Sequence, residues 1–415
     1  KTNAMNQWRI KLSLLINYFV FAILLNSVGT VILMVQRNFG ISPGSASLLE
    51  GFKDFPIAIT SFLVASFLVR IGYKRSMLIG LGLVTGICLV MPSIPHFWMT
   101  KLLFLTIGVS FALIKVSVFA TIGLISNDQK EHLSFMNFLE SFFMVGVLSG
   151  YFIFSGFIQD NDPADKSWLH VYYLLAGLSS LAFVLLLTTP INESAVNKEI
   201  KSSLGEEFLA MIKLMALPLV VVFIVSIFLY VLIEQSIMSW LPTFNKDVLK
   251  LPTILSVQMA SILAGSQALG RFTAGFVLKK IYWYYVVCVT LVIAAALVLI
   301  CMPMAKAAVG HEVAGWSTAP VAAFIFPLIG FCLAPVYPAV NSVMLSTLPK
   351  HQHGPMSGLI VVFSALGGTI GSIITGHLFE WFGGQKAFYF SLVPITLIMV
   401  ALYFFNRRTR QLRKT

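Results

Sequence analysis

A few ionisable residues lie inside long apolar stretches of this chain, and these are the residues that could do chemistry. They are Glu50, Lys53, Asp54, Lys115, Glu140 and Glu234. A charge in hydrocarbon is costly and is normally retained only for an ion pathway, a proton relay or a ligand site. The pattern therefore predicts a membrane protein with a polar site in its interior.

The first group combines two carboxylates with an ammonium. Glu50 precedes Lys53 by three residues and Asp54 by four, so all three share one face of a helix. Lipid cannot solvate that face, which must point into the protein. One interpretation is a solvated helix end with a local ion pair. The other is a functional site, in which Glu50 or Asp54 binds a coupling proton and Lys53 contacts the substrate.

Lys115 lies deeper than the other ionisable residues, between apolar segments on both sides. A lysine so far from either membrane surface reaches water only if the protein encloses a cavity. It could be a structural residue that is paired with a carboxylate in the packed core. We favour a cavity lysine that binds an anionic group of the substrate or exchanges partners.

The other candidates are a carboxylate near a membrane surface and a set of polar residues within the spans. Glu140, near the start of its span, is expected to act in gating. Each polar residue could instead make a hydrogen bond between helices. The further candidates for substrate binding are Asn26, Glu234, Gln235, Gln258, Tyr337 and Asn341.

The composition excludes a soluble protein. The 415 residues are 58% hydrophobic and only 11% charged, whereas a soluble domain is about a quarter charged. The net charge of +12 does not indicate nucleic-acid binding, because the basic residues lie in loops between apolar stretches. The four cysteines lie in apolar segments without metal-ligand spacing, and no catalytic constellation is present. We expect no enzyme activity, no cofactor and no bound metal.

The apolar stretches predict an all-α membrane protein. A spanning helix needs about 20 apolar residues. Several loops between the stretches are very short, so those helices must be antiparallel neighbours. Twelve spans are predicted, at residues 11–35, 45–69, 76–95, 99–124, 134–158, 168–189, 215–241, 254–278, 282–303, 319–347, 355–380 and 386–406.

A long polar stretch divides the spans into two sets of six. The predicted domains are an N-terminal bundle (1–190), a cytoplasmic linker (191–214) and a C-terminal bundle (215–415). A turn with glycine and basic residues follows the second span at 70–75, and a similar one is expected after the eighth at 270–275. The repeated turn suggests that the two halves of the chain are pseudo-symmetric and arose by a parallel duplication.

The basic residues also predict the orientation. If both termini lie on one side of the membrane, that side carries 19 of the 28 Lys and Arg residues and the other side carries seven. Positive charge accumulates on the cytoplasmic side. We therefore expect a multi-pass protein of a bacterial inner membrane with both termini in the cytoplasm.

At this point the chain resembles the major facilitator superfamily over all twelve spans. A loop motif of that family, G-x3-D-R-x-G-x-K-R, aligns with Ala65, Val69, Arg70, Gly72, Lys74 and Arg75. Ala65 replaces the first glycine and Val69 replaces the aspartate, so the ion pair that this aspartate makes in the family is in doubt here. The resemblance implies a conformational role for Arg70, Lys74, Arg75 and Arg271.

Within that family, two stretches resemble the branch of sugar–proton symporters that includes fucose permeases. They are Phe228-Leu229-Tyr230-x3-Glu234-x5-Trp240-Leu241-Pro242 and Pro335-x-Tyr337-Pro338. That branch has an acidic residue for proton coupling at about the position of Lys115. The difference argues against a neutral sugar bound by the same carboxylate, and it leaves the coupling to Glu50 or Asp54.

The sequence thus predicts a secondary transporter that works by alternating access. The expected cargo is a small polar solute, a sugar or sugar-like organic anion, moved by proton-coupled symport. The expected partners are the solute, the coupling proton and the lipid bilayer; nucleic acid is not a partner, and the protein is expected to be a monomer. The alternatives are a proton-coupled efflux antiporter for amphipathic compounds and a receptor of the same fold that transports nothing.

Overall fold

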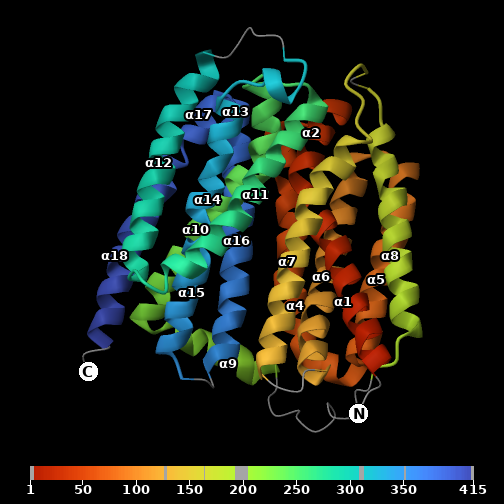
Figure 1. Cartoon of the computed structure of the whole chain (residues 1–415), viewed down its shortest axis with the longest axis vertical. Helices are drawn as coiled ribbons and strands as arrows, with labels where there is room; N and C mark the ends of the chain where they lie inside the picture. The colour runs from red at the N-terminus through yellow and green to blue at the C-terminus, as the bar shows by residue number, and fades with distance from the viewer. Residues whose placement is uncertain are drawn as a thin grey trace. The chain divides into compact units, whose positions relative to one another are not determined.

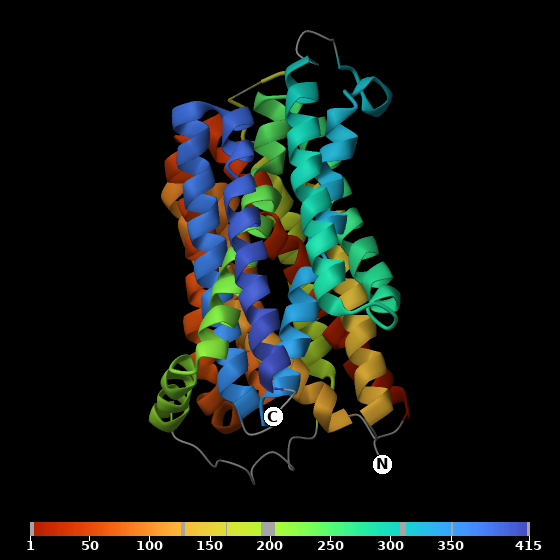
Figure 2. The same cartoon turned by 90° about the vertical axis from the view of Figure 1, so that its left-hand side faces the viewer.

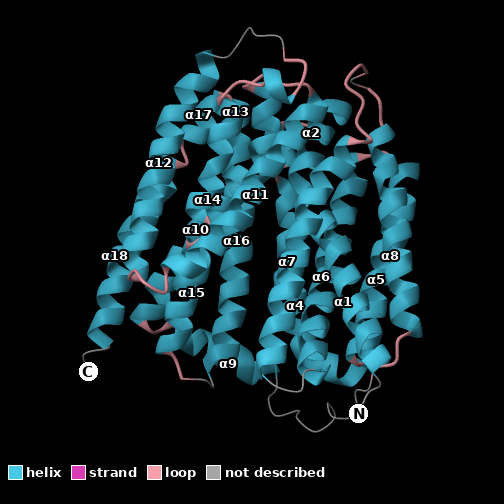
Figure 3. Ribbon diagram, in the orientation of Figure 1, coloured by secondary structure: helices cyan, strands magenta, loops and turns pink. Residues whose placement is uncertain are grey.

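The computed structural model describes residues 4–125, 129–162, 164–191, 204–307, 313–349 and 352–412. These residues form helices and connecting loops, and none of the described residues lies in a strand (Figure 3). The prediction of an all-α protein is therefore confirmed.

The chain forms two compact units. The first comprises Lys1–Val28 and Phe52–Leu204, and the second comprises Gly29–Gly51 and Gly205–Thr415. The segment Gly29–Gly51, which we assigned from the sequence to the N-terminal bundle, thus groups with the second unit. Helix α4 (Leu48–Ile71) begins in the second unit and continues in the first.

The first unit contains most of the helices drawn from red to yellow in Figure 1; α2 (Val28–Phe39), also drawn in red, groups with the second unit. Helix α1 packs against α7 and α8, and α5 packs against α6 and α8. Besides α4, its elements are α1 (Ala4–Asn26), α5 (Tyr73–Val90), η1 (Met91–Ser93), α6 (Phe97–Ile125), α7 (Gln129–Ser155), η2 (Ser167–His170) and α8 (Val171–Thr188).

The second unit is built around α10, which packs against α11, α16 and α18. Its early elements are α2 (Val28–Phe39), α3 (Pro43–Ala46), α9 (Leu204–Met215), α10 (Pro218–Asp247), α11 (Thr253–Val277) and α12 (Trp283–Ala307). Its later elements are η4 (Trp316–Thr318), α13 (Ala322–Ile325), η5 (Phe326–Leu328), α14 (Ile329–Leu333), α15 (Val336–Thr347), α16 (His353–Phe382), α17 (Gly384–Tyr389) and α18 (Leu392–Leu412).

Several predicted continuous spans are interrupted, among them the first, the tenth and the twelfth. The first span breaks at Ser27, whose hydroxyl donates to the carbonyl of Leu24 at 2.7 Å, a type of bond that often bends helices. The tenth divides into α13, η5, α14 and α15, with Pro327 and Pro335 near the breaks, because proline has no N–H to continue the ladder. The twelfth divides into α17 and α18.

Two predicted loops also differ. Part of the predicted linker is the helix α9, and residues 192–203 of the linker lie outside the described residues. The expected turn at 270–275 lies inside α11, so only the following residues around Lys279 and Lys280 form a turn. The turn after α4 is where we expected it, and Gly72 adopts a φ of 92° there, which favours glycine.

Ten helical segments in the described part of the chain are long and apolar enough to cross a membrane. The second and eighth predicted spans, α4 and α11, are not among these ten. Both carry charged or polar side chains: Glu50, Lys53 and Asp54 in α4, and Gln267 and Arg271 in α11.

Candidate functional site

In the first unit, Lys115 lies among aromatic rings. Its ammonium nitrogen is 5.8 Å from the ring centroid of Phe111 and 5.9 Å from that of Phe119, one helical turn away on each side. Ring faces attract cations at such distances. Among the described residues, no carboxylate oxygen lies within 4.0 Å of this nitrogen. The alternative interpretation, a structural lysine in a tight ion pair, would require such a carboxylate in contact with Lys115.

Tyr18 of α1 completes the aromatic surroundings of Lys115. Its ring centroid lies 6.3 Å from that of Phe111, 6.2 Å from that of Phe119 and 5.8 Å from that of Phe143 in α7. Tyr18 is 1% exposed, and its hydroxyl has no hydrogen-bond partner among the described residues. A buried hydroxyl without a partner is costly, and it often marks a place where a ligand or water binds.

Glu140 lies at the level of Lys115. The rings of Phe111 in α6 and Phe143 in α7 are 6.4 Å apart. Lys115 follows Phe111 by four residues and Glu140 precedes Phe143 by three, so on two antiparallel helices both are one turn toward the same end. The carboxylate interacts electrostatically with Lys115 and with Tyr18. Glu140 is therefore a counter-charge to Lys115 without being an ion-pair partner in contact.

Lys53 and Asp54 form a second charged pair in this unit. The Lys53 nitrogen lies 3.5 Å from a carboxylate oxygen of Asp54, and both residues are buried. Gly108 of α6 allows close approach here, since a Cβ at Gly108 would overlap the carbonyl oxygen of Lys53 and lie 3.1 Å from the Cβ of Pro56. The pair is thus held at a tight crossing of α4 and α6.

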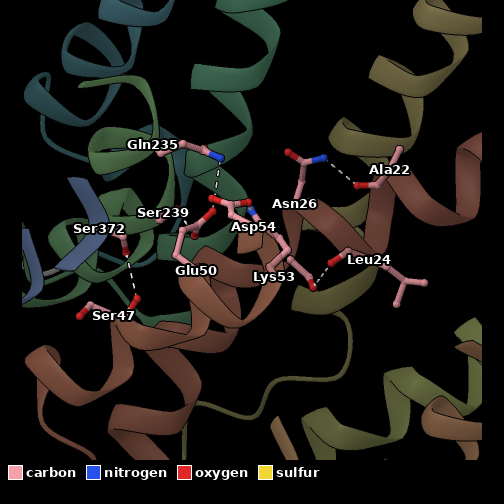
Figure 4. A network of polar contacts seen from close by, with 11 residues as sticks. Ala22, Leu24, Asn26, Ser47, Glu50, Lys53, Asp54, Gln235, Ser239 and Ser372 are labelled. Carbon is pink, nitrogen blue, oxygen red and sulfur yellow. Dashed lines mark hydrogen bonds and ion pairs between the residues drawn. The ribbon is translucent and has the colours of Figure 1, made fainter. Parts of the chain in front are cut away.

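Glu50 lies in the second unit and is fully buried there. Its carboxylate accepts hydrogen bonds from the Ser239 hydroxyl at 2.8 Å and from the Gln235 side-chain amide at 3.3 Å (Figure 4). Both donors come from α10 and are four residues apart, so one face of that helix solvates the carboxylate. The structure therefore brings the predicted residues Glu50 and Gln235 together.

Close backbone packing holds Glu50 in this position. The Ser372 hydroxyl of α16 donates to the carbonyl of Ser47 at 3.5 Å (Figure 4). It also accepts a bond from the Trp240 indole at 3.1 Å. A Cβ at Gly29 would lie 2.8 Å from the carbonyl oxygen of Ser239. Small residues at these positions let the segment Gly29–Gly51 approach α10 and α16 within the second unit.

A second carboxylate in this unit, that of Glu234, is the centre of a polar cluster. It accepts hydrogen bonds from the Tyr230 hydroxyl at 2.8 Å and from the Gln267 amide at 3.1 Å. Its oxygen lies 3.6 Å from a guanidinium nitrogen of Arg271, whose side chain is 47% exposed. Arg271, predicted as a gating residue, is therefore in contact with a predicted substrate-binding residue.

Tyr337 and Asn341 extend this cluster. The ring of Tyr337 lies 5.6 Å from that of Tyr230, and its hydroxyl is 3.5 Å from that of Ser364. Asn341 follows Tyr337 by four residues in α15, so the two share a helix face, and the Asn341 side-chain oxygen is buried without a hydrogen-bond partner among the described residues. The structure thus places Glu234, Tyr337 and Asn341, all predicted from the sequence, in one region of the second unit.

The remaining predicted residues lie apart from these clusters. The Asn26 amide donates to the Ala22 carbonyl of its own helix at 2.9 Å (Figure 4), and the Gln258 carbonyl accepts from the Trp316 indole at 3.0 Å. Lys74 donates to the Leu187 carbonyl at 2.9 Å, and Arg75 is exposed. The side chain of Arg70 lies outside the described residues.

Sequence reasoning did not assign a role to Ser239 or Tyr230, and it named Tyr18 only as a neutral polar candidate. A signal for the first two exists: Ser239 follows Gln235 by four residues, and Tyr230 precedes Glu234 by four, so each shares a helix face with a candidate. For Tyr18 the deciding observation is its contact with three rings from other helices, which no local spacing contains.

The family model described as Major Facilitator Superfamily matches residues 14–371 and 307–415. A search of curated protein sequences gave no match.

Several solved structures share the fold at low sequence identity. The nucleoside transporter NupG has a TM-score of 0.76 at 15% identity, covering 95% of this chain and 99% of that chain. A bacterial homologue of the human lysosomal transporter Spinster, in an inward-facing and occupied conformation, has a TM-score of 0.75 at 11% identity, covering 97% and 96%. The E. coli fucose:proton symporter FucP has a TM-score of 0.60 at 15% identity, covering 95% and 98%.

Proposed function

The chain belongs to the Major Facilitator Superfamily, and we propose that it is a secondary active transporter for a small organic anion with a sugar-like, hydroxyl-bearing body. The family assignment makes it a multi-pass membrane transporter and not an enzyme, as the sequence predicted. The substrate, the coupling ion and the direction of transport form the proposal.

The environment of Lys115 carries this proposal. The ammonium lies over two ring faces, with the unpartnered hydroxyl of Tyr18 nearby and with no carboxylate in contact among the described residues. A lysine held this way can accept a carboxylate as its direct partner, and the compact ammonium offers three donors. An apolar drug would offer the ammonium no acceptor and no counter-charge of its own, which disfavours an apolar substrate.

Glu140 gives the site a way to release its substrate. When the site is empty, the Glu140 carboxylate at the same level compensates the charge of Lys115. An arriving substrate carboxylate takes over that role at shorter distance, and release returns the lysine to Glu140. This exchange keeps the lysine compensated throughout the cycle, which is needed because an isolated charge in a low dielectric is costly.

The proposed coupling groups are Glu50 and Asp54, which are both buried. Glu50 is bonded to Ser239 and Gln235, whereas Asp54 is paired with Lys53. A change of these partners would change the free energy of protonation, because nearby donors and cations favour the charged carboxylate. Protonation in one conformation and release in the other is the proposed basis of symport.

Within the second unit, the Glu234 cluster is proposed as a region that binds hydroxyl groups. Tyr230, Gln267, Tyr337 and Asn341 all carry side chains that donate or accept hydrogen bonds. Arg271 compensates the charge of Glu234. Gln258 and Asn26, whose amides already have bonds, are proposed as secondary contacts.

We also propose the location and the assembly of the protein: a monomer in a bacterial inner membrane with both termini in the cytoplasm. The proposed domains are residues 1–190, 191–214 and 215–415. Arg70, Lys74 and Arg75 are proposed to act in gating. The excess of Lys and Arg on one set of loops supports the orientation.

Counterflow in vesicles containing the purified protein tests the proposal. Vesicles preloaded with an unlabelled sugar acid should accumulate the labelled compound transiently. Lys115→Ala should greatly reduce this accumulation because it weakens substrate binding. A thermal-shift screen with sugars, sugar acids and small carboxylates identifies the compound first, since a ligand of the native state raises its stability. Outward transport of amphipathic compounds alone would instead support an efflux antiporter, and binding without counterflow would indicate a receptor.

A further inference from the structure

The second unit contains an apolar crevice that the proposed transport cycle does not use. It has a volume of about 280 Å³ and lies between α10, α16 and the start of α18. Figure 2 looks onto this side of the unit, with α16 and α18 in blue and turns of α10 between them. Its lining is almost entirely hydrocarbon, with Leu232, Ile237, Leu378, Phe388 and Leu397 among its residues.

The three hydroxyl groups in the lining do not make the crevice polar. Ser236 donates to the Leu232 carbonyl at 2.6 Å, Thr375 to the Gly371 carbonyl at 2.8 Å, and Ser391 to the Phe388 carbonyl at 2.6 Å. Each hydroxyl hydrogen is thus used within its own helix or turn. An engineered apolar cavity of about 150 Å³ in another protein stays dry and binds benzene. Water is therefore a poor occupant of this larger crevice.

The mouth of the crevice opens on the lipid-facing surface. Four of its residues are strongly exposed although they are large and apolar: Ile374, Phe390, Val393 and Leu397. Ile374 belongs to α16, Phe390 lies between α17 and α18, and Val393 and Leu397 belong to α18. All four lie in helical segments that are long and apolar enough to cross a membrane. A hydrocarbon chain can enter from this surface without crossing water.

One end of the crevice carries features of a membrane–water interface. Trp381 and Phe382 are 67% and 50% exposed, as is usual for aromatic residues at headgroup level. Lys386 in α17 is also exposed and directly precedes the lining residue Ala387. The nearest acidic residue in sequence, Glu380, accepts a bond from the Gly44 backbone amide. A negative group at this end would thus meet the ammonium of Lys386.

From these features we infer that the crevice is a phospholipid site, in which one acyl chain fills the space between α10, α16 and α18 and the phosphate pairs with Lys386. The lipid lies in the leaflet near α17, at the end of the unit opposite the C-terminus (Figure 1). A bound acyl chain would fill the space between α18 and α10 and contact both helices, which would stabilise the packing of the second unit.

Photolabelling tests this inference. The full chain is reconstituted in phospholipid vesicles with a trace of a phospholipid that carries a diazirine midway along one acyl chain, and labelled peptides are identified by mass spectrometry. We expect several-fold more label on the segments 374–378 and 390–397 than on the exposed apolar face of α12, which includes Val289 and Ile300. Equal labelling of the two surfaces would overturn the inference.

Two pairs of variants separate the parts of the site. Ser391→Phe fills the crevice and should remove most of the label, whereas Val292→Phe adds the same ring to the exposed face of α12 and should not. The amount of unlabelled anionic phospholipid that halves the labelling measures how tightly the site binds the headgroup. This amount should be several-fold higher for Lys386→Gln than for Lys280→Gln, in which a matched exposed lysine at the other end of the unit is replaced. Full labelling of Ser391→Phe, or equal competition in both lysine variants, would contradict the site as stated.

Discussion

The hydroxyl of Ser239 donates a hydrogen bond of 2.8 Å to the carboxylate of Glu50, although the two residues are 189 positions apart in the chain. Both are buried, and both belong to the second unit. The beginning of α4 is therefore packed with α10, while the rest of α4, with Lys53 and Asp54, belongs to the first unit. One helix thus carries two carboxylates in different surroundings.

Glu50→Gln and Asp54→Asn should uncouple transport from the proton gradient. Each change keeps the shape of the side chain and removes its charge, so substrate exchange should persist while accumulation driven by a pH gradient is lost in at least one variant. Uptake and counterflow in the same vesicles measure the two activities. If both variants accumulate substrate at normal rates, neither carboxylate couples transport to protons.

Lys115→Ala should raise the apparent KM roughly 10- to 100-fold, since hydrogen bonds to a charged group contribute about 1.5–3 kcal/mol. Lys115→Arg should also be impaired, because the guanidinium is planar and larger. The matched control is Lys101→Ala, in the same helix, whose ammonium lies 4.6 Å from the ring centroid of Phe97. An unchanged KM in Lys115→Ala would make this lysine a structural residue.

Glu140→Gln should bind substrate more tightly and release it more slowly. The substitution removes the counter-charge that competes with the substrate carboxylate for Lys115, so the apparent KM and the maximal rate should fall together. Initial rates over a range of substrate concentrations give both values. A KM that does not change would show that Glu140 does not compete at this site.

The stability of the protein should fall less when Glu234 loses its charge than when it loses its hydrogen-bond acceptor. Glu234→Gln keeps an oxygen for Tyr230 and Gln267, whereas Glu234→Leu leaves buried donors unpaired at about 1–3 kcal/mol each. The exposed Arg271 contributes less, because solvent screens its charge. In detergent, the Glu234→Leu variant should therefore have a lower thermal unfolding temperature than the Glu234→Gln variant. The reverse order would mean that the ion pair dominates the cluster.

Gly108→Ala should destabilise the first unit by about 1–3 kcal/mol, because the new methyl group would overlap the Lys53 carbonyl at the crossing of α4 and α6. Gly86→Ala on α5 is the control, since a Cβ there meets no atom within 4 Å and alanine favours helix. Thermal unfolding of the two variants measures the difference. Equal stability would show that this helix crossing relaxes without cost.

The sequence by itself determined that the protein spans the membrane and which residues are unusual. Apolar stretches of spanning length, few charges and biased loops require helices in lipid, because only helices or closed barrels satisfy the backbone there. The same logic marks Lys115, Glu50 and Glu234, since a charge in a span requires compensation. The resemblance to the major facilitator superfamily, read from short motifs, was confirmed by the family match.

Only the tertiary structure decided which of these residues are partners. Local spacing places Glu50 beside Lys53, but its hydrogen bonds come from Ser239 and Gln235, because packing between distant helices fixes which donor reaches a buried carboxylate. Helix periodicity predicts a face and does not say which helix that face meets. The same reason explains why the aromatic surroundings of Lys115 were not predicted: the Tyr18 and Phe143 rings come from two other helices.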